Sequence, residues 1–326
     1  MSSLIRQRPI LVTGSHRSGS TWVGQMIASH PLVAYVWELF NPKIKPADSP
    51  VQRWFEYVTP ERARDFIDYL GPRLRWESNW SADFKERPGP RRFIGASGRA
   101  VRNWWRRLRG TRPLLKDPIA CFSAEWLADT FDMDVIVLIR HPAAFVSSIK
   151  RLNWRFRFRQ ILEQTSLMER YLHPFESQLH DYARLQDPWT LDLVDEGILW
   201  WRLFHHVIDC YRKQRPSWEF ARHEDLSVRP MEEFERILQR FGLSMTRQVR
   251  HAITVHTDGE NPAEAPHLKA HQLKRNSRAN IFNWMKRLTP AEIAKIRRET
   301  EDVARHFYSD VDWLHQGEPT ATPSAA

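Results

Sequence analysis

The sequence predicts an α/β protein with parallel strands, on the evidence of three short stretches. Residues 9–24 (PILVTGSHRSGSTWVG) place an apolar run, a turn of small residues and an apolar-periodic segment in succession, which indicates a strand, a loop and a helix. Residues 134–154 repeat this order, and their apolar run 135–139 is typical of a buried parallel strand. Residues 113–118 (PLLKDP) indicate a third, shorter strand.

Composition narrows the class of protein further. The chain has 326 residues, of which 42% are hydrophobic and 27% charged. This length and hydrophobic content are sufficient for the core of one large domain. The net charge of +10 and the pI near 9.8 favour an anionic partner, namely a cofactor, an acidic glycan or nucleic acid. We expect no membrane span, because no apolar run reaches 18 residues. The N-terminus lacks a signal-peptide core and both cysteines have apolar neighbours, so we expect a cytoplasmic location.

The loop after the first predicted strand is suited to bind a tetrahedral anion. The first backbone N–H groups of a helix have no partner within the helix, and the helix dipole adds positive charge there. Residues 14–21 (GSHRSGST) have the glycine spacing of a nucleotide P-loop, except that Ser20 stands where the P-loop lysine should be. The cation lies inside the loop instead, at Arg17. This arrangement suits a less charged anion and does not require a metal ion.

A second candidate anion site follows the strand at residues 135–139. Arg140 stands at the C-terminal end of this strand, Pro142 opens a helix, and Ser148 lies eight positions after Arg140. An arginine fork can bind two phosphate oxygens at once, and a serine hydroxyl adds a neutral donor. The alternative is a strand-end arginine in a surface ion pair.

Two further strand ends carry charged side chains. Residues 32–40 (LVAYVWELF) indicate a strand with Glu38 at its end, and in α/β folds these ends face the ligand crevice. A solvated loop acid is the alternative interpretation of Glu38. The strand at residues 113–116 ends in Lys116, followed by Asp117 and Pro118.

Residues 43–112 show no alternation of strands and helices and are rich in Trp and Arg. The run 98–110 (GRAVRNWWRRLRG) is strongly basic and contains paired tryptophans. We rank its roles as a helix lining an acceptor cleft, then a solvated helix face, then a nucleic-acid contact. The region is expected to be a helical insertion that forms part of an acceptor site.

These motifs together resemble those of the sulfotransferases that use 3′-phosphoadenosine 5′-phosphosulfate (PAPS). RSGSTW at residues 17–22 matches the first signature of that family, and Arg140 with Ser148 matches the second. The basic stretch before Trp284, with Arg275, Ser277 and Arg278, is similar to a third family feature. The resemblance covers residues 9–42, 113–154 and 216–306. It implies a three-layer, P-loop-like fold with a central parallel sheet over residues 1–316. The tail at residues 317–326 has low sequence complexity, so we expect it to be disordered.

The resemblance also implies a reaction, the transfer of a sulfuryl group from PAPS to a hydroxyl or amine without a metal ion. Glu38 would be the base, with Asp117 in reserve, because Pro118 stands where cytosolic members carry a catalytic histidine. Lys116 would neutralise charge on the transferred group. The implied cofactor-binding residues are Arg17, Ser18, Gly19, Ser20, Thr21 and Trp22 for the 5′-phosphosulfate, and Arg140, Ser148, Arg275, Ser277 and Arg278 for the 3′-phosphate.

The resemblance suggests a small-molecule or glycan acceptor, by analogy a carbohydrate or glycolipid, and no nucleic acid. The sequence carries no signal of oligomeric state. One alternative is a P-loop kinase or ATPase, which would require a lysine in place of Ser20 and a metal-binding acid. The other is a protein that binds an anion or nucleic acid without catalysis.

Overall fold

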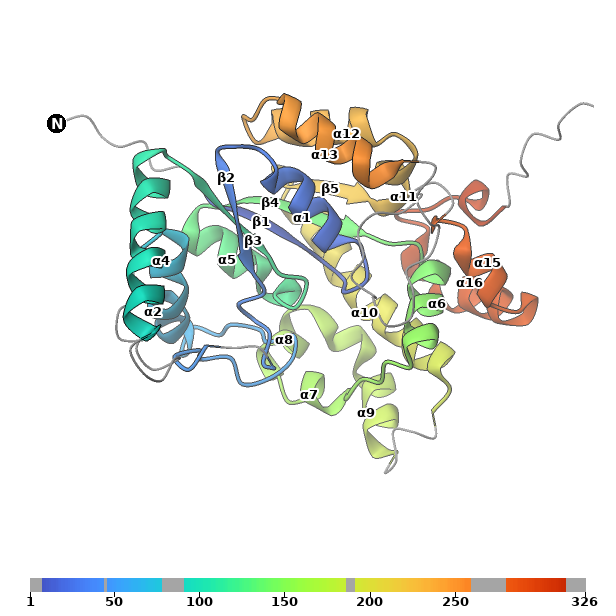
Figure 1. Cartoon of the computed structure of the whole chain (residues 1–326). Helices are drawn as coiled ribbons and strands as arrows, with labels where there is room; N and C mark the ends of the chain where they lie inside the picture. Colours follow the sequence, from blue (N-terminus) through green and yellow to red (C-terminus); the bar gives the residue numbers. More distant parts are fainter. Residues whose placement is uncertain (1–7, 44–45, 78–90, 186–190, 259–279, 315–326) are drawn as a thin grey trace, which may run out of the picture.

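The computed structural model describes residues 8–43, 46–77, 91–185, 191–258 and 280–314, with the backbone alone for 91–96. A sheet of five strands forms the centre of the molecule (Figure 1), in the order β2-β3-β1-β4-β5. The strands are β1 (Ile10–Gly14), β2 (Val33–Trp37), β3 (Arg112–Lys116), β4 (Asp134–Ile139) and β5 (Glu219–Arg222). Every pairing between them is parallel, so all five carboxyl ends reach the same edge.

Strand β1 lies in the middle of the sheet and is buried along its whole length. Its first residue, Ile10, pairs with Leu114 of β3 on one side and with Asp134 of β4 on the other. Its last residue, Gly14, has a φ of +135°, and a Cβ there would lie 2.4 Å from the carbonyl oxygen of Leu138. Only glycine allows the chain to leave the sheet at this point.

Helices cover both faces of the sheet, which gives three layers (Figure 1). One face packs against α1 (Ser20–Ala28), α11 (His223–Val228), α12 (Pro230–Arg240) and α13 (Arg247–Thr257). The other packs against α5 (Ala124–Phe131), α6 (Pro142–Leu152) and α10 (Leu193–Gln214). Strand residues alternate between the two cores, since Ile10 and Val12 belong to the first and Leu11 to the second. The predicted three-layer α/β fold with a parallel sheet is confirmed.

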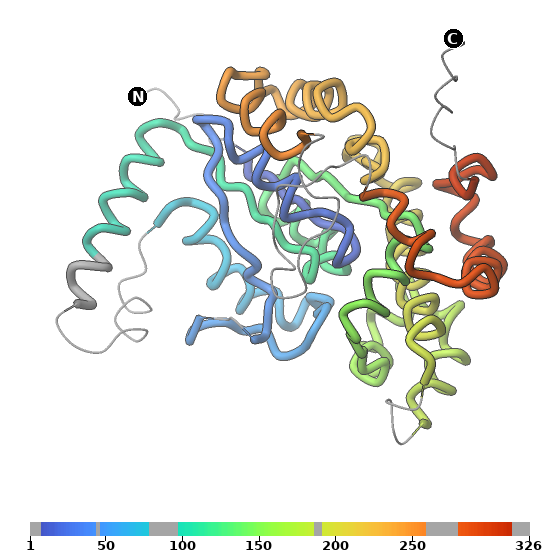
Figure 2. Tube along the Cα trace, turned by 45° about the vertical axis from the view of Figure 1, so that its right-hand side comes forward, coloured from blue at the N-terminus to red at the C-terminus, as the bar shows by residue number. Residues whose placement is uncertain are grey.

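The remaining elements lie outside these layers. Helix α2 (Ala63–Leu74) lies beside α4 (Arg91–Leu108) (Figures 1 and 2). Between α6 and α10 lie the short helices α7 (Arg159–Leu162), α8 (Thr165–Leu167) and α9 (Glu176–Arg184). Helices α15 (Asn283–Arg287) and α16 (Pro290–Ala304) follow α13. Among the described residues, no helix is long and apolar enough to cross a membrane.

Candidate active site

A cavity of about 820 Å³ opens at the edge of the sheet where the strands end. Its walls come from the β1–α1 loop, the ends of β2 and β4, helix α6, the segment 153–161 and helices α10, α11 and α15. Seven of the described lining residues are Lys or Arg, and one, Glu38, is acidic. This excess of cations favours an anionic ligand.

The loop between β1 and α1 turns sharply through two residues of left-handed backbone. Arg17 has a φ of +65° and Gly19 a φ of +94°. A Cβ at Gly19 would lie 2.4 Å from the His223 ring, so the loop and α11 are in close contact there. Helix α1 begins at Ser20, and the residues from Gly19 to Trp22 line the cavity. The first N–H groups of this helix therefore lie where an anion could accept hydrogen bonds from them.

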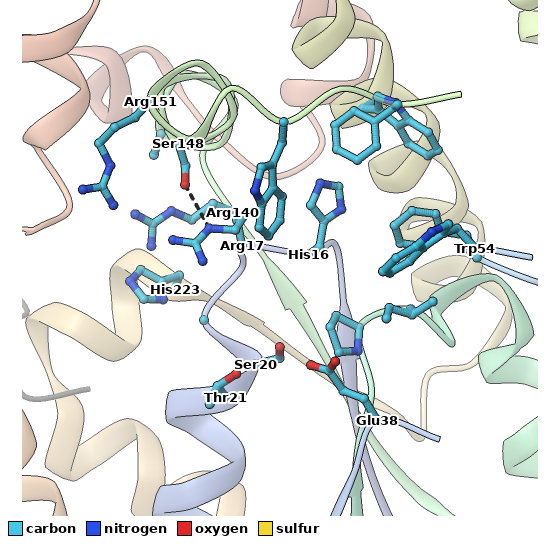
Figure 3. Close-up of a pocket in the computed structure, with 18 of the residues that line it drawn as sticks. His16, Arg17, Ser20, Thr21, Glu38, Trp54, Arg140, Ser148, Arg151 and His223 are labelled. Atoms are coloured by element: carbon cyan, nitrogen blue, oxygen red, sulfur yellow. Dashed lines mark hydrogen bonds between the residues drawn. The ribbon is translucent and has the colours of Figure 1, made fainter. Parts of the chain in front are cut away.

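The two anion motifs meet at one end of the cavity (Figure 3). The Nε of Arg17 donates a hydrogen bond of 3.0 Å to the Oγ of Ser148, although the two residues are 131 positions apart. The Arg17 guanidinium also lies over the ring of Trp154, 5.6 Å from its centroid. The loop cation and the helix hydroxyl are thus in direct contact at the cavity wall.

Arg140 lies in the same part of the cavity, and its side chain is only 10% exposed. Burial lowers the pKa of its guanidinium from the usual value, and the nearby Glu224 carboxylate opposes that effect. Glu224 lies 3.7 Å from Nε of Arg140 and also accepts hydrogen bonds from the Tyr308 hydroxyl (2.9 Å) and the His141 N–H (3.2 Å). A carboxylate shared in this way leaves much of the guanidinium's bonding capacity for a phosphate group.

Glu38 lines the cavity at the end of β2, and Lys116 lies behind it. The buried ammonium of Lys116 is paired with Oε1 of Glu38 and lies 4.5 Å from the Trp37 ring centroid. The second oxygen of Glu38 accepts a hydrogen bond of 2.9 Å from Asn41. A Cβ at Gly24 of α1 would lie 3.1 Å from the Lys116 side chain, so this glycine leaves room for the lysine stem. Glu38 is therefore held in one orientation at the cavity wall.

Asp117, the reserve base of the sequence prediction, lies elsewhere. Its carboxylate accepts backbone hydrogen bonds from Phe40 (2.7 Å), Ile119 (3.0 Å) and Ala120 (3.3 Å). Burial raises its pKa to about 7. It is fully buried and does not line the cavity, so its contacts serve to join the turns after β2 and β3.

His16 occupies an aromatic cage on the other side of the loop. Its ring centroid lies 4.9–6.4 Å from those of six aromatic residues, Phe55, Phe145, Trp154, Phe156, Trp200 and Phe204. Neither ring nitrogen has a hydrogen-bond partner among the described residues. Burial, with a smaller contribution from Arg17, lowers the pKa of His16 to about 3. The ring is therefore neutral at physiological pH.

We expect the His16→Phe variant to resist acid better than the wild type. The folded protein cannot protonate His16 above about pH 3, whereas the unfolded chain does so below about pH 6.5. As the pH is lowered between these limits, His16 should therefore reduce the free energy of unfolding of the wild type by about 1.4 kcal/mol per pH unit. Urea unfolding between pH 4 and 8 would measure the slope. His251→Phe is the control, since His251 is exposed, and an unchanged slope in His16→Phe would contradict the expectation.

Most of the predicted site residues lie together. The cavity lining contains Arg17, Gly19, Ser20, Thr21, Trp22, Glu38, Arg140 and Ser148. Ser18 and Lys116 are buried just behind it. The predicted basic loop, with Arg275, Ser277 and Arg278, lies outside the described residues. The predicted acceptor insertion contributes Lys43, Trp54 and Phe55 to the cavity lining. The run 98–110 is ranked first as a helix that lines an acceptor cleft, but no described side chain of α4 lines this cavity.

Several lining residues were missed by the sequence analysis. Arg151 lies one helical turn after Ser148 and could have been found from that spacing. His223 follows directly on β5, so the strand-end rule that singled out Glu38 also applies to it. Trp154 and Arg287 had no comparable signal, because tertiary packing alone brings their segments to the cavity.

Comparison with known proteins gives the family. A profile of the sulfotransferase family matches residues 9–193, more than half of the chain. No curated protein sequence matches the chain.

Solved structures with a similar chain course include three sulfotransferases. The sulfotransferase domain of the Synechococcus PCC 7002 olefin synthase shares 17% identity at a TM-score of 0.48, covering 94% of this chain and 97% of its own. The sulfotransferase domain of the curacin biosynthetic pathway has 14% sequence identity and a TM-score of 0.47, and the match covers 92% of this chain and 96% of that domain. Mouse sulfotransferase SULT7A1, complexed with PAP, has 11% identity and a TM-score of 0.45, and the match covers 94% of this chain and 88% of the mouse protein. On the strength of the profile match, this chain belongs to the sulfotransferase family.

Proposed function

We propose that the protein transfers a sulfuryl group from PAPS to a hydroxyl of an acceptor, and that the acceptor is a carbohydrate or glycolipid. The observation that carries this proposal is the contact between Arg17 and Ser148 at one end of a cavity whose wall also holds Glu38. A donor with a phosphosulfate and a separate phosphate needs two anion sites. The loop with Arg17 supplies one, and Arg140 with Ser148 supplies the other.

The residues present fit such a donor. The N–H groups at the start of α1 and the Arg17 guanidinium would bind the phosphosulfate, with the Ser20 and Thr21 hydroxyls as further donors. Arg140 would bind the 3′-phosphate, since its guanidinium is buried at the cavity and lies beyond ideal hydrogen-bond distance from Glu224. PAPS supplies the activated sulfuryl group, and the protein's own residues orient and stabilise it.

In the proposed reaction a bond forms between the acceptor oxygen and sulfur while the bond from sulfur to the 5′-phosphate oxygen breaks. The electron pair goes to that phosphate oxygen, where Arg17 and the loop N–H groups stabilise the developing charge. Glu38 takes the proton of the acceptor hydroxyl. Lys116, paired with Glu38, keeps this carboxylate in place beside the transferred group.

The wall around Glu38 fits a sugar-like acceptor. Trp37, which precedes Glu38, is exposed, and Trp54 and Trp154 also line the cavity. Flat aromatic faces pack well against the apolar faces of sugar rings. The two cysteines, Cys121 and Cys210, are free thiols, which supports a reducing compartment such as the cytoplasm as the place of this reaction.

The function is tested by incubating the protein with PAPS and a panel of glycans and glycolipids. Mass spectrometry should show acceptors heavier by one sulfuryl group, in step with release of adenosine 3′,5′-bisphosphate. Product from ATP instead of PAPS would favour the kinase alternative, and no product from any acceptor, together with tight nucleic-acid binding, would favour the non-catalytic one.

Turnover is expected to be unchanged by EDTA and by added Mg²⁺. A P-loop enzyme needs its lysine and metal to hold the β- and γ-phosphates, and here Ser20 replaces that lysine. Initial rates in 5-fold steps of chelator, with PAPS saturating, would measure the effect. A rate abolished by EDTA and restored by Mg²⁺ would contradict the prediction.

A further inference from the structure

Helix α4 carries an apolar stripe that faces away from the protein. Val101, Trp104, Trp105 and Leu108 follow the spacing of one helix face, and all four are exposed. Trp104 is 55% exposed and Trp105 54%, and their rings contact each other edge to face, with centroids 5.1 Å apart. Single exposed apolar residues are normal, but four on one helix face form a patch that requires an explanation.

The opposite face of α4 is polar and anchors the helix. Arg99, Asn103 and Arg106 share that face and are half-buried. The Arg106 guanidinium lies over the Trp76 ring, 4.4 Å from its centroid, and the Trp76 indole donates a hydrogen bond of 2.7 Å to the carbonyl of Thr111. The helix is thus fixed with Arg99 and Arg106 inward, and the apolar stripe has to point outward. Figures 1 and 2 both place α4 at the margin of the molecule.

The charge around the stripe has one sign. Helix α4 contains six arginines and no acid, and no acid occurs from Arg91 to Lys116. Arg102 and Arg109 flank the stripe on one side and Arg107 on the other, and all three are exposed. Burial lowers the pKa of Arg106, and the positive charge of the neighbouring Arg102 adds to this effect. An apolar strip between cations is complementary to a surface that is apolar inside and anionic outside.

We propose that this stripe, Val101, Trp104, Trp105 and Leu108 with its flanking arginines, binds the protein to the surface of an anionic lipid bilayer. Tryptophan favours the boundary between headgroups and acyl chains, because its ring is apolar and its N–H is polar. Arginine can bury its stem there and keep the charge at the phosphates. In this arrangement the helix lies in the plane of the interface and does not cross the bilayer.

A second copy of the chain is a poorer occupant. In a twofold-symmetric dimer the same patch contacts itself, so the arginines of one α4 would face those of the other. No acid within the segment could compensate this repulsion. Nucleic acid would satisfy the arginines and could stack on the tryptophans, but Val101 and Leu108 would gain little from it.

The test is sedimentation of the full chain with vesicles of phosphatidylcholine containing 0–40% phosphatidylglycerol. Binding should increase with the anionic lipid and decrease with salt. Trp104→Ser/Trp105→Ser should weaken binding at least about tenfold, since two indole rings leave the lipid. Each of Arg102→Ala and Arg107→Ala should weaken it about fivefold. The matched control is Val311→Ser/Leu314→Ser, which removes two equally exposed apolar side chains from another part of the molecule.

Three outcomes would overturn the proposal. The first is no binding to anionic vesicles at low salt, or binding that all variants share. The second is a dimer in light scattering that Trp104→Ser/Trp105→Ser dissociates, without vesicle binding. The third is RNA or DNA binding that depends on the same residues, again without vesicle binding. Equal melting temperatures of wild type and variants would show that the stripe packs against no other part of the chain. Vesicle binding requires no donor, so this result is independent of the proposed reaction.

Discussion

Glu38→Gln is expected to lower kcat by roughly 10²–10⁴-fold, the usual contribution of a general base. The amide keeps the shape of the side chain but cannot take the acceptor proton. The Lys116 ammonium can still donate a hydrogen bond to the amide oxygen, so the local structure should persist. Affinity for adenosine 3′,5′-bisphosphate should be unchanged, because Glu38 is not among the residues proposed to bind this nucleotide. Single-turnover kinetics and calorimetry would separate these two effects.

The matched control is Glu125→Gln. Glu125 has the same side-chain exposure as Glu38, 17%, and is also held by a cation, Arg215. It does not line the cavity, so its loss should affect stability and leave kcat of the folded enzyme unchanged. Asp117→Asn is not a neutral control. The amide keeps only one acceptor oxygen, so either the buried Phe40 N–H or those of Ile119 and Ala120 would face a donor instead. A Glu38→Gln enzyme with near wild-type kcat would show that the base lies elsewhere.

Arg140→Ala is expected to weaken binding of adenosine 3′,5′-bisphosphate by about 2–5 kcal/mol, or roughly 30- to 5,000-fold. In the proposed complex the variant would leave the 3′-phosphate without its partner, and it leaves Glu224 without the nearby Arg140 cation. Affinity for AMP, which lacks the 3′-phosphate, should change much less. Isothermal titration with both nucleotides gives the difference directly. Equal affinity of the wild type for AMP and the bisphosphate would contradict the assignment of Arg140.

Two further variants isolate the cause. Arg140→Lys keeps the charge and removes the fork, so it should recover part of the affinity. Arg222→Ala removes another strand-end arginine, on the neighbouring strand β5. Arg222 is bound to Asp225 and Asp312 and does not line the cavity, so its loss should not affect nucleotide selectivity. A similar loss of affinity in Arg222→Ala would indicate a general disturbance of this sheet edge.

The fold, and the position of Arg17, Arg140 and Ser148 at one cavity, could be predicted because their signals are local. A strand, a small-residue turn and a charged strand end are adjacent in sequence, and parallel pairing brings such ends to one edge. The aromatic cage of His16 could not be predicted, since its rings come from separate segments between Phe55 and Phe204. Periodicity likewise identifies the apolar stripe of α4 but not its direction, which the contact between Arg106 and Trp76 decides.

The central position of β1 also has a consequence for biosynthesis. This apolar strand leaves the ribosome before its partners β3 and β4, which begin about a hundred residues later, at Arg112 and Asp134. At about 5–20 residues per second, β3 follows β1 after roughly 5–20 s and β4 after roughly 6–25 s on each nascent chain. Until then the edges of β1 are open, and such edges pair readily with other chains. The newly made protein should therefore depend on chaperones that shield β1 until β4 has emerged.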